Sequence, residues 1–94
     1  MRIAALLLLA ACAPDDRCDA MCDAALARYE GCLEDAGLSW GPSVGYTSPA
    51  DYTDWCETWV WEARQTDREA SCDSRLTAFR DGDCSDYYAA WASE

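Results

Sequence analysis

Cysteine is the residue type with the richest chemistry in this sequence. The chain of 94 residues contains seven cysteines and no histidine. Thiols bind zinc, form disulfides or carry a covalent group, but common zinc sites need cysteines in closely spaced pairs, often together with histidine. Paired CxxC motifs are lacking here, and the export-like start of the chain directs it to compartments where thiols oxidise, so disulfides are favoured over a metal site.

Other catalytic and metal-binding patterns are weak. Without histidine, a nucleophile lacks its usual general base, and neighbouring carboxylates are typical of solvated helix ends. Segment 81–86 has the opening oxygen spacing of a calcium loop, but Asp86 stands where glycine is needed and Ala92 stands at the closing glutamate position. We interpret this segment as a helix cap and expect no enzyme activity, no metal and no cofactor.

Aromatic residues form the second distinctive group, with five Trp and five Tyr. Those on the core stripes of the expected helices are explained as filling for a thin core. Four others either form an exposed patch bordered by acids or are covered by the loop that carries two of them. We call these four residues the candidate aromatic set: Trp40, Tyr46, Trp55 and Trp61.

The first residues have the pattern of an export signal. Arg2 precedes nine apolar residues, 3–11, which are too few to span a bilayer but match the apolar part of a signal peptide. From Leu9 to Cys12 the chain reads leucine, alanine, alanine, cysteine. This run resembles the lipobox of bacterial lipoproteins.

The resemblance implies a lipoprotein signal peptide at 1–11 and a diacylglycerol thioether on Cys12. Residues 12–16 would then be the anchor and a short tether. Many Gram-negative lipoproteins kept in the inner membrane carry aspartate at the next position, where this chain has Ala13. The resemblance therefore implies anchoring in the outer membrane of the cell envelope. The alternatives are a soluble secreted protein and a cytosolic protein with a buried first helix.

A helix from Arg17 to Gly37 organises the expected fold. At about 100° per residue, one stripe of this helix carries three cysteines and apolar residues up to Ala36, while the acids fall elsewhere. Gly37 suits the left-handed position that ends many helices. We expect the other helices to be cross-linked to this one.

Capping signals mark the next two helices. Ser48 and Pro49 fit an N-cap and a first helical residue, and this helix is expected to end near Gln65. Thr66, with Glu69 three residues later, predicts a capping box that restarts the chain as a third helix.

A short fourth helix is expected over residues 85–93, with Tyr88 and Trp91 on its core side. No strand pattern is visible. The sequence therefore predicts an all-α fold for residues 17–94: a small disulfide-stapled bundle of three helices plus a short C-terminal fourth helix.

The positions of the cysteines along the helix axes predict how they pair. We expect the first and third helices to be parallel, with the second antiparallel between them, because cysteines at matching heights can then bond. The expected pairs are Cys18–Cys72, Cys22–Cys56 and Cys32–Cys84.

The formal net charge of −11 disfavours nucleic acid as a partner, because phosphates are repelled. Two functions from different classes stay open. The first is a non-enzymatic envelope lipoprotein, held on a membrane by its N-terminal lipid, whose acidic helical domain binds an envelope protein or has a structural role. The second is a small-ligand module that binds a sugar or a cationic compound with the Trp-rich loop and the second helix.

Overall fold

The computed structural model describes residues 17–92, so the signal-like segment, Cys12 and the tether lie outside the described residues. The described part contains four α-helices and one 3-10 turn. These are α2 (Arg17–Asp35), η2 (Pro42–Val44), α3 (Pro49–Gln65), α4 (Ser71–Asp81) and α5 (Cys84–Ala92). Extended structure over 17–92 is limited to one isolated bridge between Gly41 and Tyr46. The predicted all-α bundle with a short fourth helix is confirmed.

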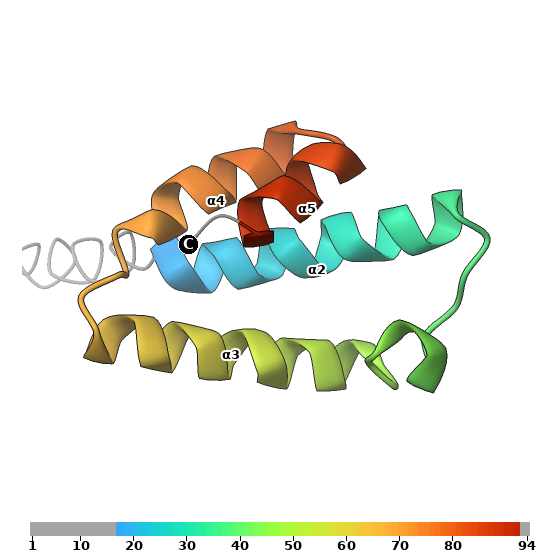
Figure 1. Ribbon diagram of the computed structural model, residues 1–94, viewed down its shortest axis with the longest axis horizontal. Helices are drawn as coiled ribbons and strands as arrows, with labels where there is room; N and C mark the ends of the chain where they lie inside the picture. The colour runs from blue at the N-terminus through green and yellow to red at the C-terminus, as the bar shows by residue number, and fades with distance from the viewer. Residues whose placement is uncertain (1–16, 93–94) are drawn as a thin grey trace, which may run out of the picture.

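Helix α2 lies in the middle of the bundle (Figure 1). α3 runs antiparallel along one side, and α4 runs parallel along the other, with α5 folded back beside α4 and α2. The predicted directions are correct, but the prediction that the second helix lies between the other two is wrong. The buried stripe of α2 is wide enough to cover both neighbours.

The sequence of α2 explains this central position. Its buried residues occur in every turn: Cys18, Met21, Cys22, Ala25, Tyr29, Cys32 and Leu33. The helix ends as predicted, since Gly37 has φ 72° and the Leu38 N–H donates to the Leu33 carbonyl at 2.8 Å. Ala36 lies past the helix end and is exposed, so its expected core position is wrong.

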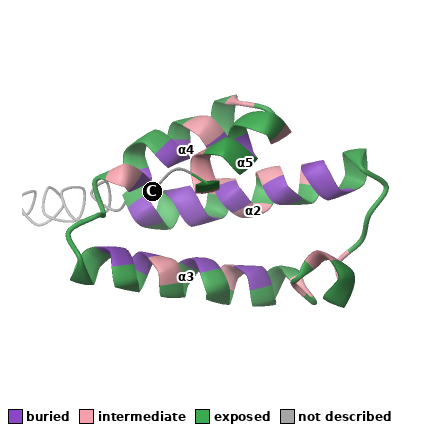
Figure 2. Ribbon diagram, in the orientation of Figure 1, coloured by how far each residue is buried: buried purple, intermediate pink, exposed green. Residues whose placement is uncertain are grey.

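Helix α3 begins as predicted. Ser48 Oγ accepts a bond from the Asp51 N–H at 3.1 Å, and Pro49 is the first helical residue. Its buried residues recur every three or four positions and lie on the side turned toward α2 (Figure 2): Tyr52, Cys56, Val60 and Ala63. Trp59, expected on this stripe, is only half-buried.

The predicted capping box at Thr66 is wrong. The Thr66 hydroxyl donates back to the Glu62 carbonyl at 2.9 Å, so it closes α3 and does not open the next helix. Asp67 then takes a left-handed φ of 59°, and α4 starts only at Ser71. The Thr66 side chain is held at the end of α3 and therefore does not cap the start of α4.

The last two helices carry the other half of the core. α4 buries Cys72, Leu76 and Phe79 as predicted, whereas α5 buries Tyr87 and leaves Tyr88 54% exposed, which corrects the expected inward position of Tyr88. Cys84 is bonded to Cys32 of α2, and adjacent helical residues point about 100° apart, so Tyr87 and Tyr88 cannot both face the core.

A reciprocal cap and a close glycine fix the start of α5. Asp83 Oδ1 accepts the Asp86 N–H at 2.9 Å, and Asp86 Oδ2 accepts the Asp83 N–H at 3.0 Å. The bond from the Asp86 N–H to the Asp83 carboxylate lowers the pKa of Asp83. A Cβ on Gly82 would lie 2.6 Å from the Ala78 carbonyl oxygen, so glycine permits the close approach of the two helices.

Candidate functional site

The three disulfides join α2 to every other helix. The bonds are Cys18–Cys72, Cys22–Cys56 and Cys32–Cys84, with Cα–Cα distances of 5.0, 5.9 and 5.8 Å. These are the same three pairs that the heights along the helices predict. The pairing needs only the directions of the helices, because one cysteine of each pair lies on α2, so the wrong lateral order did not affect it.

Three members of the candidate aromatic set join a single ring cluster. Trp40 packs on Tyr29 at 5.5 Å between ring centroids, and Tyr46 meets the edge of Tyr52 at 4.9 Å. Trp55 is 36% exposed and contacts Tyr46 at 5.8 Å. The loop after α2 thus covers its own aromatic residues.

Trp61 is separate from that cluster. It is 63% exposed and makes no ring contact with another aromatic residue in 17–92. The candidate aromatic set therefore does not line one concavity, and its expected exposure holds for Trp61 and in part for Trp55.

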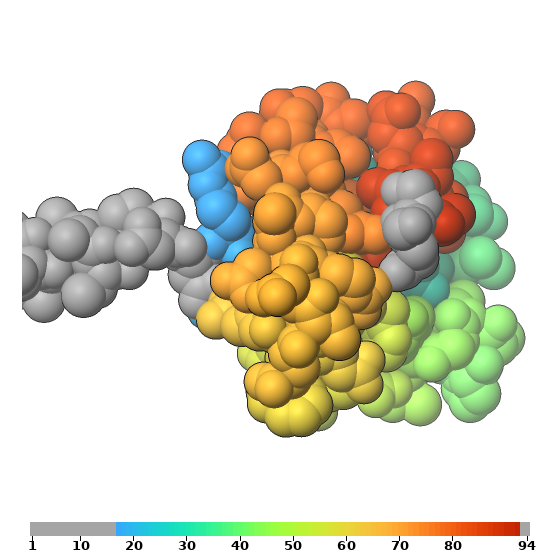
Figure 3. Space-filling model, turned by 60° about the vertical axis from the view of Figure 1, so that its left-hand side comes forward, coloured from blue at the N-terminus to red at the C-terminus, as the bar shows by residue number. Residues whose placement is uncertain are grey.

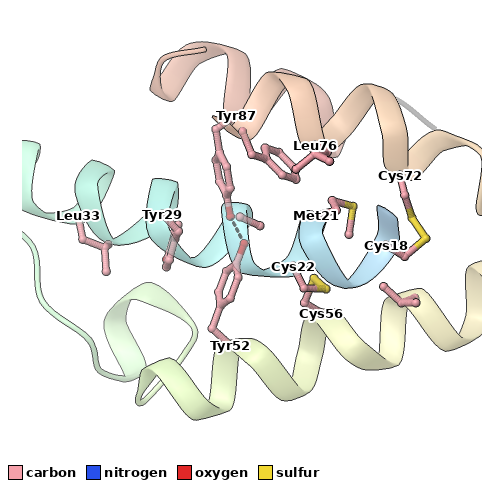
Figure 4. Close-up of a cluster of buried hydrophobic side chains, with 13 residues drawn as sticks. Cys18, Met21, Cys22, Tyr29, Leu33, Tyr52, Cys56, Cys72, Leu76 and Tyr87 are labelled. Atoms are coloured by element: carbon pink, nitrogen blue, oxygen red, sulfur yellow. Dashed lines mark hydrogen bonds between the residues drawn. A yellow bond between two sulfur atoms is a disulfide. The ribbon is translucent and has the colours of Figure 1, made fainter. Parts of the chain in front are cut away.

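A buried pair of tyrosines lies at the centre of the cluster. The hydroxyls of Tyr52 and Tyr87 are hydrogen-bonded to each other across the gap between α3 and α5 (Figure 4). Tyr29 stacks on both rings, at 5.0 and 5.8 Å. Burial raises the pKa of Tyr52 to about 12 and also raises the pKa of Tyr87. Both phenols are therefore neutral at ordinary pH, which suits a structural bond.

Arg75 is a buried cation that the sequence analysis missed. Its guanidinium carbon lies 4.8 Å from the Trp59 ring centroid and 5.4 Å from that of Trp91. Its Nε donates to the Ala90 carbonyl at 3.1 Å and its Nη1 to Ser71 Oγ at 2.6 Å. The available signal was the position of this arginine, three residues after a core cysteine. Arg75 holds the end of α5 through its bond to Ala90.

Arg28 makes a similar contact with α4. Its Nε donates to the Phe79 carbonyl at 2.9 Å and its Nη2 to the Arg80 carbonyl at 3.2 Å. These are carbonyls of the last turn of α4, where helices lack intrahelical donors. Two of the few cations are thus directed at helix ends, and the acidic side chains remain on the surface.

An open groove of about 990 Å³ runs between α4 and α5. Small residues of the two helices form most of its lining, including Ser74, Ala78, Ala89 and Ala90. Arg68 lies at its rim together with Asp81 and Asp86, but Asp86 is bonded to the start of α5. This groove contains none of the candidate aromatic set.

A smaller groove of about 550 Å³ lies where α2 passes into the following loop. Trp40 and the 52% exposed Leu38 line it together with Glu30 and Glu34. Neither glutamate forms an ion pair with an arginine of the described part of the chain. Carboxylates beside an indole ring suit a cationic group, through charge and cation–π attraction. We call it the end groove.

Among residues 17–92, no group of three or more His, Cys, Asp or Glu side chains is placed to hold a metal ion. The segment 81–86 is a helix cap, as interpreted from the sequence. In the same range, no helix combines the length and apolar character needed to cross a membrane.

Comparison with models of known protein families, with curated proteins and with solved structures found no match for this chain. The end groove is the feature that sequence reasoning missed most clearly. The sequence points to Trp40 through its aromatic ring, but Glu30 and Glu34 lie off the core stripe of their helix and are not distinguished there from its other acids. Their spacing of four residues, which places both on one side of a helix, was the available signal.

Proposed function

We propose that this chain is a non-enzymatic lipoprotein of the bacterial cell envelope, anchored through a lipid on Cys12, whose acidic helical domain binds a protein partner. The cysteine inventory carries the proposal. The three disulfides use six of the seven cysteines, which leaves Cys12, directly after Leu9-Ala10-Ala11, without an intramolecular partner. Stable disulfides are also typical of compartments outside the cytoplasm. Ala13 makes the outer membrane the proposed destination.

The end groove is the proposed contact for the partner. It lies at the far end of α2 from the tether, about 27 Å away along a helix of 19 residues. A domain held at its other end would present this groove away from the lipid. Glu30 and Glu34 favour a partner that inserts a lysine or arginine side chain beside Trp40.

A small cationic compound is the second candidate, because the same groove fits a single cationic group. A sugar-binding platform has less support, since it needs several open ring faces on one surface, whereas Tyr46 and Trp55 pack on other rings and Trp61 lies apart from them. The two candidates differ in the extent of the contact. A protein partner would also contact residues outside the end groove, whereas a small cationic compound would contact only the groove.

The anchor is tested by the intact mass of the membrane fraction and by its partition into detergent. The mature wild-type chain should carry the mass of diacylglycerol and further acyl chains and enter the detergent phase. Cys12→Ala should lack both properties, whereas the control Ala13→Ser should keep them. An unmodified Cys12 in the soluble fraction would refute the anchor.

The partner is tested by chemical cross-linking in intact envelopes, comparing wild type with Glu30→Gln/Glu34→Gln. The double variant should lose a protein cross-link that the control Asp23→Asn/Asp54→Asn, on exposed positions of α2 and α3, retains. If no protein is captured, titration with tetramethylammonium or arginine amide tests the second candidate. Binding of neither a protein nor these probes would remove the end groove as a site.

A further inference from the structure

Trp61 is level with the point where the tether enters the domain. The Cys22–Cys56 bond fixes the register of antiparallel α2 and α3. Trp61 lies five residues beyond Cys56, which is about 7.5 Å along α3, and Arg17 lies five residues before Cys22, which is the same distance in the same direction. The most exposed tryptophan in the described part of the chain therefore lies at the tethered end.

The proposed anchor would keep this end close to lipid. From Cys12 to Arg17 there are five residue steps, which span about 17 Å at most in a fully extended chain. Figure 3 shows the same end of the molecule, with the start of α2 beside the connection between α3 and α4. A tilt toward α3 brings the outer side of that helix to the lipid surface without a longer tether.

The position of Trp61 on α3 directs its ring outward. Five residues from Cys56 amount to about 140° around the helix, which is the side away from α2. Indole rings prefer the boundary between headgroups and acyl chains, because one edge is apolar and the N–H still finds a polar partner. A ring that contributes little to the core is free to make this contact.

Charge at the tethered end is mixed. Arg17, Arg64 and Arg68 lie there, with Arg17 paired to Asp73 at 3.2 Å, together with the exposed acids Asp19, Asp67 and Glu69. The opposite end exposes mostly acids: Glu30, Glu34, Asp35, Asp51, Asp81, Asp83 and Asp86. Because Glu57 and Glu62 flank Trp61 on α3, a zwitterionic surface suits this end better than an anionic one.

From this geometry we infer that Trp61 is a second membrane contact of the anchored domain, inserting into the headgroup region of a zwitterionic bilayer. The inference rests on the proposed lipid anchor. Two contacts, the acyl chains and Trp61, fix the orientation of the domain, so that the end groove points away from the surface.

The test uses the lipidated full chain in phosphatidylcholine vesicles that contain brominated phosphatidylcholine, which quenches nearby tryptophans. Wild type should be quenched, Trp61→Phe should lose most of that quenching, and the control Trp40→Phe, at the opposite end, should keep it. The acyl chains should hold Trp61→Phe on the vesicles, so partition alone does not change.

The outcomes separate the two proposals. A lipidated chain in which Trp61→Phe is quenched as strongly as wild type overturns the inference and leaves the anchor intact. A chain whose intact mass shows an unmodified Cys12 overturns both. Replacing part of the lipid with phosphatidylglycerol should reduce the quenching of wild type, and an increase would show that the surface recognised is anionic.

Discussion

Helices α3 and α4 lie on opposite sides of α2 but are held in different ways. α4 is bound to α2 directly by Cys18–Cys72, and Cys32–Cys84 fixes the start of α5 just beyond its other end. Arg28 adds two bonds to the last carbonyls of α4. α3 has a single disulfide, Cys22–Cys56, near its middle.

Aromatic contacts attach α3 to the rest of the bundle, whereas a second disulfide and Arg28 serve that purpose for α4. Tyr52 reaches Tyr87 through its hydroxyl, while Trp55 and Trp59 both contact Trp91, at 4.9 and 5.3 Å. Large side chains bridge a gap that smaller ones would leave open. This need for large bridging side chains explains why so short a chain has so many aromatic residues.

Removing single disulfides gives the largest expected difference. Cys22→Ala/Cys56→Ala should cost about 2–5 kcal/mol in the free energy of unfolding and remove hydrogen-exchange protection selectively from α3. Cys32→Ala/Cys84→Ala should have a similar cost, but α4 should stay protected through Cys18–Cys72. Equal hydrogen-exchange protection of α3 in the two double variants would show that its aromatic contacts alone hold it in place.

Tryptophan replacements on α3 come next. Trp59→Ala should cost about 3 kcal/mol, because Arg75 loses an aromatic face and a void opens beside Trp91. Trp61→Ala should stay within about 0.5 kcal/mol of wild type, since its ring is mostly exposed. Chemical denaturation measures both. Equal costs would contradict the assigned exposure of Trp61.

The bond between Tyr52 and Tyr87 provides a third test. Tyr52→Phe leaves one buried hydroxyl without a partner and should cost about 1–3 kcal/mol, whereas the double variant Tyr52→Phe/Tyr87→Phe should cost less than the sum of the singles. A double-mutant cycle measures the difference. Strict additivity would mean that the two hydroxyls do not interact.

The same pair predicts alkaline sensitivity. Below pH 10 the phenol of Tyr52 is neutral in both states, so its contribution is complete. As pH rises from about 10 toward 12, the unfolded chain ionises first because the folded pKa is raised, and stability should fall by about 3 kcal/mol. Circular dichroism and tyrosinate absorbance should change together, and Tyr88→Phe should behave like wild type.

Two glycines give small predicted effects, with opposite signs. Gly31→Ala should raise stability by about 0.5–1 kcal/mol, because an added Cβ meets nothing within 4 Å and helical glycine is entropically costly. Gly82→Ala should lower stability by about 1 kcal/mol or more, through contact with the Ala78 carbonyl. Thermal unfolding distinguishes the two, and a gain in both would contradict the tight turn.

The sequence predicted properties that depend on position along a helix. The α2 stripe, the Ser48 cap and the heights of the cysteines follow from a regular rise and rotation per residue. The lateral order of the helices does not follow, because heights carry no information on which side of α2 a neighbour packs. The inward position of Tyr87 was missed because Tyr88 was expected there, and neighbouring residues on a helix point about 100° apart.

The candidate site was predicted less well than the fold. Exposure of Trp61 follows from its place outside the α3 stripe, and the structure agrees. The end groove depends on how the chain turns after Gly37, where the Leu38 N–H bonds to Leu33 and the Tyr29 hydroxyl bonds to the Val44 carbonyl. The first bond follows from the glycine at Gly37, but the second joins residues 15 apart in the chain, so periodicity does not encode where the loop packs.

The Cys18–Cys72 bond also determines how the domain responds to mechanical load. A pull on Arg17 reaches a covalent cross-link after one residue, so the force passes into α4 before α2 can unravel. A load applied between the two ends of α2 meets a second cross-link at Cys32. Even if the hydrogen bonds of α2 broke, Cys18 and Cys32 would stay connected through Cys72 and Cys84, so the length of that second path would limit how far they could separate.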